Sequence, residues 1–192
     1  MPLKLSKENV PLLLALAGYA FTYWHTKASD TRLKRIERVS DQVKLLYGPL
    51  LAAVTASKKA FEAMIRLHSP DGSPETFIQT ARSQPGSKEA QAYRLWMTEV
   101  LQPLNEKAAK VLSENTDLLE TDDVEPLLLH LISHVASNRV ILKGWQAGDM
   151  DTRKLPITYP DGLLAYVQGE YSRLKAIQAK LIGVPHGRRS KL

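Results

Sequence analysis

Two histidines one helical turn apart have the type and spacing that come closest to a reactive site. His130 and His134 stand in the stretch HLISH, and imidazoles at positions i and i+4 of a helix can bind one metal ion. Zinc proteases with this spacing carry a glutamate directly after the first histidine, but here Leu131 follows it. The protease interpretation therefore fails, and His130 and His134 are weak candidates for a metal site. A third ligand would have to come from His68, Glu62 or Asp117.

The alternative is that His134 faces the core and hydrogen-bonds to Asn138 or a tyrosine, with His130 nearer the boundary. The chain has no cysteine, which excludes disulfides, thiolate metal sites and cysteine nucleophiles. It also has no phosphate-binding glycine loop, dinucleotide-binding pattern or nucleophile elbow, and its acidic residues are dispersed. We therefore predict no catalytic residue and no cofactor, and we favour a protein that is not an enzyme.

A few aromatic residues could instead line a ligand pocket where two kinked helices leave space. These are Tyr47, beside Gly48-Pro49, together with Trp96 and Trp145. Aromatic residues on apolar helix faces belong to the core far more often, so the pocket is the weaker interpretation.

The last three residues, Ser190-Lys191-Leu192, match the peroxisomal import signal, and Arg188 and Arg189 precede them. The import receptor reads this tripeptide at a free C-terminus. The signal predicts the import receptor as a partner and the peroxisome as a location. The competing explanation is a basic tail that ends this way by chance.

An uncharged apolar segment lies near the N-terminus. Residues 9–24 read NVPLLLALAGYAFTYW, and basic residues follow from Lys27 onward. The run is short of the roughly 20 residues of a typical membrane span, but aromatic residues at its end suit a lipid headgroup zone. The sequence predicts a short single-pass anchor that binds membrane lipid, with the rest of the chain on the cytoplasmic side. The residues expected in the membrane are Val10, Leu13, Leu16, Tyr19, Phe21 and Trp24.

Three other interpretations of this segment stay open. It could be a cleaved signal peptide, with Thr26 and Ala28 at the cleavage site, although Trp24 and His25 make that site poor. It could lie flat on a membrane surface, or pack as a buried helix in the domain. A cleaved signal peptide and a working C-terminal import signal exclude each other, because secretion would divert the chain.

Beyond the apolar segment the chain shows helical periodicity and no sustained strand alternation. Ser29 or Asp30 is a plausible helix cap. Apolar residues then recur three, four or seven positions apart, as expected for one face of a long helix. They are Ile36, Val39, Val43, Leu46, Leu50, Val54, Phe61 and Ile65.

Further helices follow, separated by turn signals rich in Pro, Gly, Ser and Asp. We expect a short helix after Pro74, a long one from near Ser87, another from Thr121 or Asp122 to Gly148, and a last one from Asp161 to Gly183. Pro49 and Pro103 fall within apolar stripes that continue in register, which predicts kinks. The fold class is therefore all-α: a mostly antiparallel bundle of four main helices, preceded by an apolar N-terminal helix.

Two stretches carry a resemblance to a known group. The stretch Arg35-IERVSDQVKLLYGPLLAAVTASKKAFEAM-64 and the stretch His134-VASNRVILKGWQAGDM-150 resemble a group of uncharacterised small helical proteins. In that group a short N-terminal membrane segment leads into a basic helix and an LYGPL motif. The resemblance covers about two-thirds of the chain and implies a membrane-anchored helical domain, without an activity.

The composition agrees with one globular domain and two terminal segments. The chain has 192 residues, 44% of them hydrophobic, and a net charge of +6. We expect a segment 1–28, a helical domain 29–184 and a basic tail 185–192. Positive charges gather at 27–38 and in the tail, while the middle of the chain mixes both signs, so we predict no nucleic-acid partner. The expected function is a membrane-tethered interaction or structural module whose protein partner is unknown. The alternative is a soluble peroxisomal matrix protein, which could be an enzyme, imported through Ser190-Lys191-Leu192.

Overall fold

The computed structural model describes residues 10–120, 124–150 and 157–183, with side chains from Leu13 onward. All regular secondary structure in these ranges is helical, which confirms the all-α prediction. The α-helices are α1 (Val10–Asp41), α2 (Gly48–His68), α3 (Pro74–Ser83), α4 (Lys88–Trp96), α5 (Gln102–Glu114), α6 (Pro126–Gln146) and α7 (Leu163–Ile182). Two π-helical segments, η1 (Gln42–Tyr47) and η2 (Met97–Leu101), and a 3-10 turn, η3 (Thr116–Leu118), complete them.

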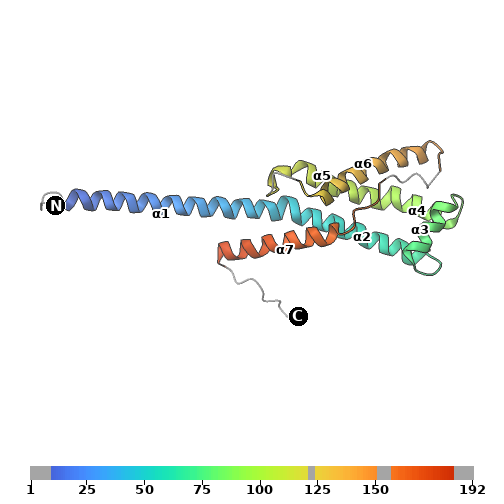
Figure 1. Cartoon of the computed structure of the whole chain (residues 1–192), viewed down its shortest axis with the longest axis horizontal. Coiled ribbons are helices and arrows are strands. Elements are labelled where there is room, and N and C mark those ends of the chain that lie inside the picture. The colour runs from blue at the N-terminus through green and yellow to red at the C-terminus, as the bar shows by residue number, and fades with distance from the viewer. Residues whose placement is uncertain (1–9, 121–123, 151–156, 184–192) are drawn as a thin grey trace.

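The two π-helical segments explain how helices continue through Pro49 and Pro103. Proline lacks the N–H of a regular helical hydrogen bond, and its ring collides with the carbonyl four residues back. A π-turn widens the helix by one residue at that place. The N–H of Gly48 accordingly donates to Val43 O, five residues back, and that of Gln102 to Met97 O. Helices α1, η1 and α2 therefore form one continuous rod that bends between α1 and α2 (Figure 1).

The long helices lie side by side in a row (Figure 1). Helix α6 packs on α5, α5 packs on α2, and α7 packs on α1 and α2. Each of these helices runs antiparallel to the helix it packs on (Figure 1). Helix α6 is thus at one edge of the row, and one of its sides has no long helix against it.

Two groups of buried apolar side chains hold the row together. The larger group joins α2, α5, α6 and α7 and includes Leu50, Leu112, Leu131 and Leu174, none of which is exposed to solvent. The smaller group closes the end farthest from the N-terminus, where Phe77 of α3 packs among residues of α2, α4 and α6.

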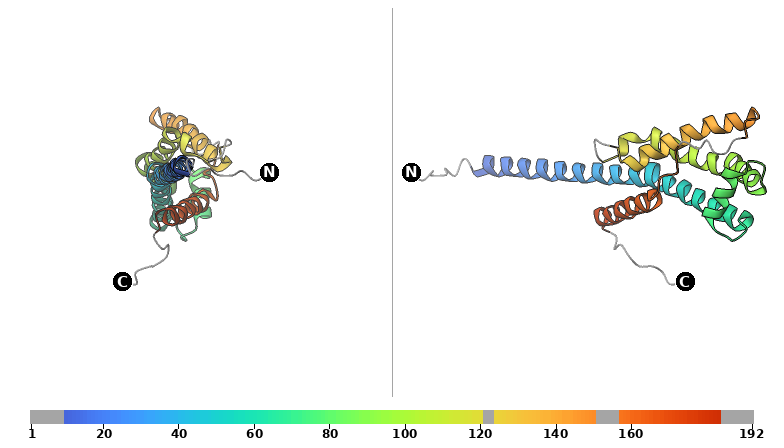
Figure 2. Two further views of the ribbon diagram at one scale, coloured as in Figure 1. Left: turned by 90° about the vertical axis from the view of Figure 1, so that its left-hand side faces the viewer. Right: turned by 45° about the vertical axis from the view of Figure 1, so that its right-hand side comes forward.

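Helix α1 differs from expectation at its start. The sequence placed a cap at Ser29 or Asp30, but α1 begins by Val10 and passes both residues without interruption. No proline or glycine lies between Tyr19 and Asp41 to break it. The N-terminal part of α1 projects from the domain as a straight rod (Figure 2). All residues from 13 to 35 are exposed, and we call this part of α1 the arm.

Candidate membrane-attachment site

The apolar half of the arm exposes large side chains on every side. Of the predicted membrane residues, Leu13, Leu16, Tyr19, Phe21 and Trp24 are exposed by 46%, 57%, 74%, 72% and 67%, while the side chain of Val10 lies outside the described part. In the structure this segment is therefore not packed in the core. The described helices contain no stretch that is long and apolar enough to cross a membrane.

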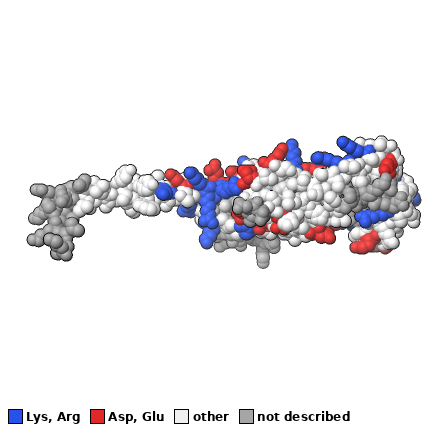
Figure 3. All heavy atoms as spheres, turned by 45° about the horizontal axis from the view of Figure 1, so that its top comes forward, with Lys and Arg blue, Asp and Glu red and all other residues white. Residues whose placement is uncertain are grey.

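Along the arm toward the domain, cationic side chains begin directly after the aromatic residues. The Nζ atom of Lys27 lies 5.9 Å from the ring centres of both Tyr23 and Trp24, within reach of a cation–π attraction. Lys34 and Arg35 follow about two helical turns further on and are exposed. Figure 3 shows that Lys and Arg gather where the arm meets the domain, whereas the described part of the arm beyond them has no charge.

Two other cations of this stretch fix the arm to the domain, a role that helical periodicity did not predict. Arg32 donates to the carbonyl oxygen of Leu181, in the last turn of α7, with its Nη2 and Nε atoms at 2.6 and 3.2 Å. Arg38 donates to the carbonyls of Asp117 and Leu119. Carbonyls at helix ends attract cations, so Arg32 in the arm and Arg38 just beyond it hold α1 against the domain.

The histidine pair is not arranged as a metal site. His134 Nδ1 lies 2.9 Å from the carbonyl oxygen of Ile157, and because a carbonyl can only accept, Nδ1 carries the hydrogen. The other nitrogen, Nε2, therefore accepts from the amide of Asn138 at 3.0 Å. Both nitrogens of His134 are engaged, while His130 is half-buried one turn away. No group of three or more His, Asp or Glu residues in the described ranges is placed to hold a metal ion.

The environment of His134 favours the neutral form of its ring. The side chain is 8% exposed, and the ring of Tyr159 meets it edge-on with 5.4 Å between centres. Burial lowers the pKa of His134, although the carbonyl of Ile157 opposes this shift. The sequence left Asn138 or a tyrosine as the expected partner; Asn138 forms the hydrogen bond, and Tyr159 makes a ring contact only. The arrangement fastens the segment before α7 onto α6.

The three aromatic residues of the hypothetical pocket are dispersed. Tyr47 is 3% exposed in the larger core group, where its hydroxyl hydrogen-bonds to Tyr166. Trp145 packs edge-on against Tyr93 with 6.2 Å between ring centres, and Trp96 donates to His68 at 3.2 Å. These residues therefore do not converge on a common pocket.

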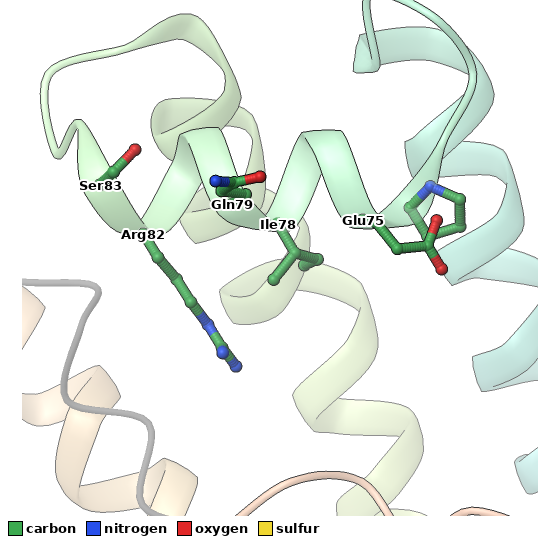
Figure 4. Close-up of a pocket in the computed structure, with 6 residues that line it drawn as sticks. Glu75, Ile78, Gln79, Arg82 and Ser83 are labelled. Atoms are coloured by element: carbon green, nitrogen blue, oxygen red, sulfur yellow. The ribbon is translucent and has the colours of Figure 1, made fainter.

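Among the hollows on the described surface of the domain, two are considered for a binding role. One, of about 630 Å³, runs along α3 between Pro74 and Ser83 and is lined by that helix alone (Figure 4). The acidic residue in the lining of this hollow, Glu75, accepts a hydrogen bond from the hydroxyl of Ser73 at 2.9 Å. The lining of this hollow therefore offers no converging set of reactive groups. The other hollow, of about 500 Å³, is a groove between α5 and α6. Sequence periodicity did not predict this groove.

The tail with Ser190, Lys191 and Leu192 lies outside the described residues, so the import signal stays a prediction. Comparison with protein-family models, curated proteins and solved structures finds no match to the chain. The resemblance around the LYGPL motif likewise stays a prediction, and function has to be argued from the arm and the domain.

Proposed function

We propose that this protein is a helical domain tethered to a membrane by its arm, which enters the lipid bilayer end-on. The observation that carries this proposal is the exposure of an uncharged apolar helix that projects from an otherwise packed domain. The side chains of Leu16 and Phe21, among others, are exposed. Burial of one such side chain is worth about 1.5–3 kcal/mol, so an apolar environment for several of them favours attachment strongly.

The order of residue types along the arm supports a bilayer as the occupant. Leucines come first, the aromatic residues Tyr19, Tyr23 and Trp24 come next, and the cations start at Lys27. Hydrocarbon, interface and anionic headgroups follow one another in the same order at a membrane surface. A rise of 1.5 Å per residue gives the uncharged part from Leu13 to Trp24 a length of about 18 Å, compared with about 30 Å for the hydrocarbon core.

The distribution of apolar side chains around the arm supports end-on entry. A helix that lies flat on a membrane needs a charged or strongly polar face toward water. Between Leu13 and Trp24 the arm has no charged residue on any side. The cations beyond it would then hold the domain at the headgroups, on the side where positive charge is retained, which is the cytoplasmic side.

Flotation with lipid vesicles tests the tether. The full chain is mixed with phosphatidylcholine vesicles that contain phosphatidylserine, and it should float with them and resist a carbonate wash. Leu16→Glu combined with Phe21→Glu should abolish flotation, because each carboxylate would enter hydrocarbon. The matched control is Leu67→Glu combined with Leu95→Glu. These leucines are 69% and 62% exposed on the domain, so this pair should float like the parent chain.

Two results would contradict the proposed membrane tether. One is flotation that the arm substitutions leave intact. The other is an arm-dependent dimer that stays with the aqueous fraction, which would mean that a second copy of the chain covers the apolar side chains instead of lipid.

A further inference from the structure

Helix α6 has an apolar face that points away from the domain. Its buried side includes Leu128, Leu131 and Val135. On the opposite side Leu129 and Val140 are 48% and 69% exposed. A surface helix normally carries charged residues there, but α6 has no acidic residue and only Arg139 and Lys143 as full cations.

The groove between α5 and α6 borders this face. Ala109 of α5 and Val135 and Ala136 of α6 line it, and two alanines among these residues leave the surface hollow. Small side chains let a third helix approach closely, at the 8–10 Å axial distance of packed helices. Ala136 is exposed and, with the exposed Ser133, lies between Leu129 and Val140 on the helix, so the groove meets this face at Ala136.

The groove has a cationic border. Lys107 and Lys110 of α5 line it and are exposed. The bridge from Lys110 to Glu114 spans 3.7 Å between exposed groups, so it holds the lysine only weakly. Glu106 also lines the groove, but Arg139 binds its carboxylate at 2.7 Å. The surplus charge of the border is therefore positive.

We propose that this surface docks an amphipathic helix of a partner protein, with apolar anchors one and two turns apart and acidic residues beside them. The anchors would seat on the face from Leu129 to Val140, and the acidic side chains would meet Lys107 and Lys110. Charge complementarity selects an acidic helix over a basic one.

The direction of α6 argues against lipid as the occupant of this surface. Helix α6 runs roughly along the axis of α1 (Figure 1). Figure 3 shows a broad area without charge on the visible side of the domain, between the top and the front of Figure 1. If the arm enters a bilayer end-on, this side stands upright from the membrane and stays in water. Apart from this argument about orientation, the docking proposal does not depend on the tether.

The probe that tests the proposal is a fluorescein-labelled synthetic helix with leucine at positions i, i+3, i+4 and i+7 and glutamate on its other face. A second peptide has lysine in place of each glutamate. Fluorescence anisotropy with the full chain should show binding of the acidic peptide at least tenfold tighter than of the basic one. Lys107→Glu combined with Lys110→Glu should weaken the acidic peptide at least tenfold, and so should Val140→Glu alone.

Matched variants separate this surface from the arm. Lys34→Glu combined with Arg35→Glu reverses the same charge on the arm, and Leu67→Glu replaces an equally exposed apolar residue; each should change the affinity less than twofold. The proposal is overturned if the acidic peptide does not bind, or if the arm variant weakens it as much as the groove variant. It is also overturned if the chain self-associates and Val140→Glu makes it monomeric, because a second copy would then occupy the surface. Since all substituted side chains are exposed, circular dichroism should show unchanged thermal unfolding of each variant.

Discussion

Among the described glycines, Gly48 is the one at which an added Cβ would come within 3 Å of a neighbouring atom. A Cβ at this position would lie 2.5 Å from the carbonyl oxygen of Val43, the oxygen that accepts the π-type hydrogen bond of Gly48 itself. Gly48→Ala must therefore distort η1, and we expect the free energy of unfolding to fall by about 1–3 kcal/mol, the usual range for overpacking.

Gly169 provides the matched control for this substitution. It lies inside α7, and a Cβ there meets nothing within 4 Å. Gly169→Ala should raise the free energy of unfolding by up to about 1 kcal/mol, because alanine loses less entropy than glycine in a helix. Urea unfolding of both variants measures the difference. Equal effects would mean that the close approach at η1 does not constrain residue 48.

His134 predicts a dependence of stability on pH. Its pKa lies below the usual value of 6.5 because the ring is buried. Below pH 6.5 the unfolded chain therefore binds more protons than the folded one, and the free energy of unfolding should fall as the pH falls from 6.5. One such group contributes at most about 1.4 kcal/mol per pH unit.

The test is urea unfolding of the parent chain and of His134→Gln at several pH values between 8 and 5. The variant should be less stable at pH 8, because it loses the bonds to Ile157 and Asn138, but its stability should change less on acidification. The bond from Arg139 lowers the pKa of the Glu106 carboxyl group, so protonation of Glu106 affects stability at a lower pH than protonation of His134. A slope that His134→Gln leaves unchanged would show that another group causes it.

These two residues also show how far sequence reasoning reaches at this scale. Asn138 could be named as the partner of His134 because residues four positions apart meet on a helix. The carbonyl of Ile157 could not, since it belongs to a connection that no periodicity places. The need for glycine at position 48 was equally hidden, because it follows from a π-turn and not from a positive φ angle.

At the scale of the elements, the contact between α1 and α7 can be tested separately. Arg32 binds the carbonyl oxygen of Leu181 through two nitrogen atoms. Arg32→Ala should lower the free energy of unfolding by about 0.5–1.5 kcal/mol and should speed amide hydrogen exchange in the last turn of α7. Arg35→Ala, three residues along the same helix, should do neither. If Arg32→Ala and Arg35→Ala gave the same rate of amide hydrogen exchange in the last turn of α7, the role of Arg32 in the contact between α1 and α7 would be wrong.

Helix positions and helix continuity through Pro49 and Pro103 could be predicted from apolar spacing and turn residues, but the continuity of α1 through Ser29 and Asp30 could not. Gly183 ends α7 at a φ of 76°, as a glycine cap does, and Ser73 caps α3 through the N–H of Thr76. Ser29 and Asp30 looked like similar caps, yet they lie inside α1. Capping residues are tolerated in an exposed helix interior at small cost, so their presence alone does not define a start.

At the scale of the whole molecule, the row of helices explains why two surfaces are left uncovered. Periodicity shows which side of each helix is apolar, but it does not show which neighbour covers that side. Helix α6 packs on α5 at the edge of the row, and the arm extends past the end of α7. The apolar residues of the arm could be named from the sequence, but their exposure and the uncovered side of α6 follow from the tertiary arrangement.

The same arrangement predicts how the arm should respond to lipid along its length. Since the chain has no cysteine, single cysteines at positions 13 to 35 can each carry an environment-sensitive fluorophore. If the arm enters end-on, shielding from water should decrease steadily from Leu13 to Leu33, a distance of about 30 Å at 1.5 Å per residue. A fluorophore at Leu33 should stay in water although this leucine is as exposed in the structure as Leu16. An arm lying flat on the surface would instead give shielding that oscillates every 3.6 residues, and that profile would contradict the end-on tether.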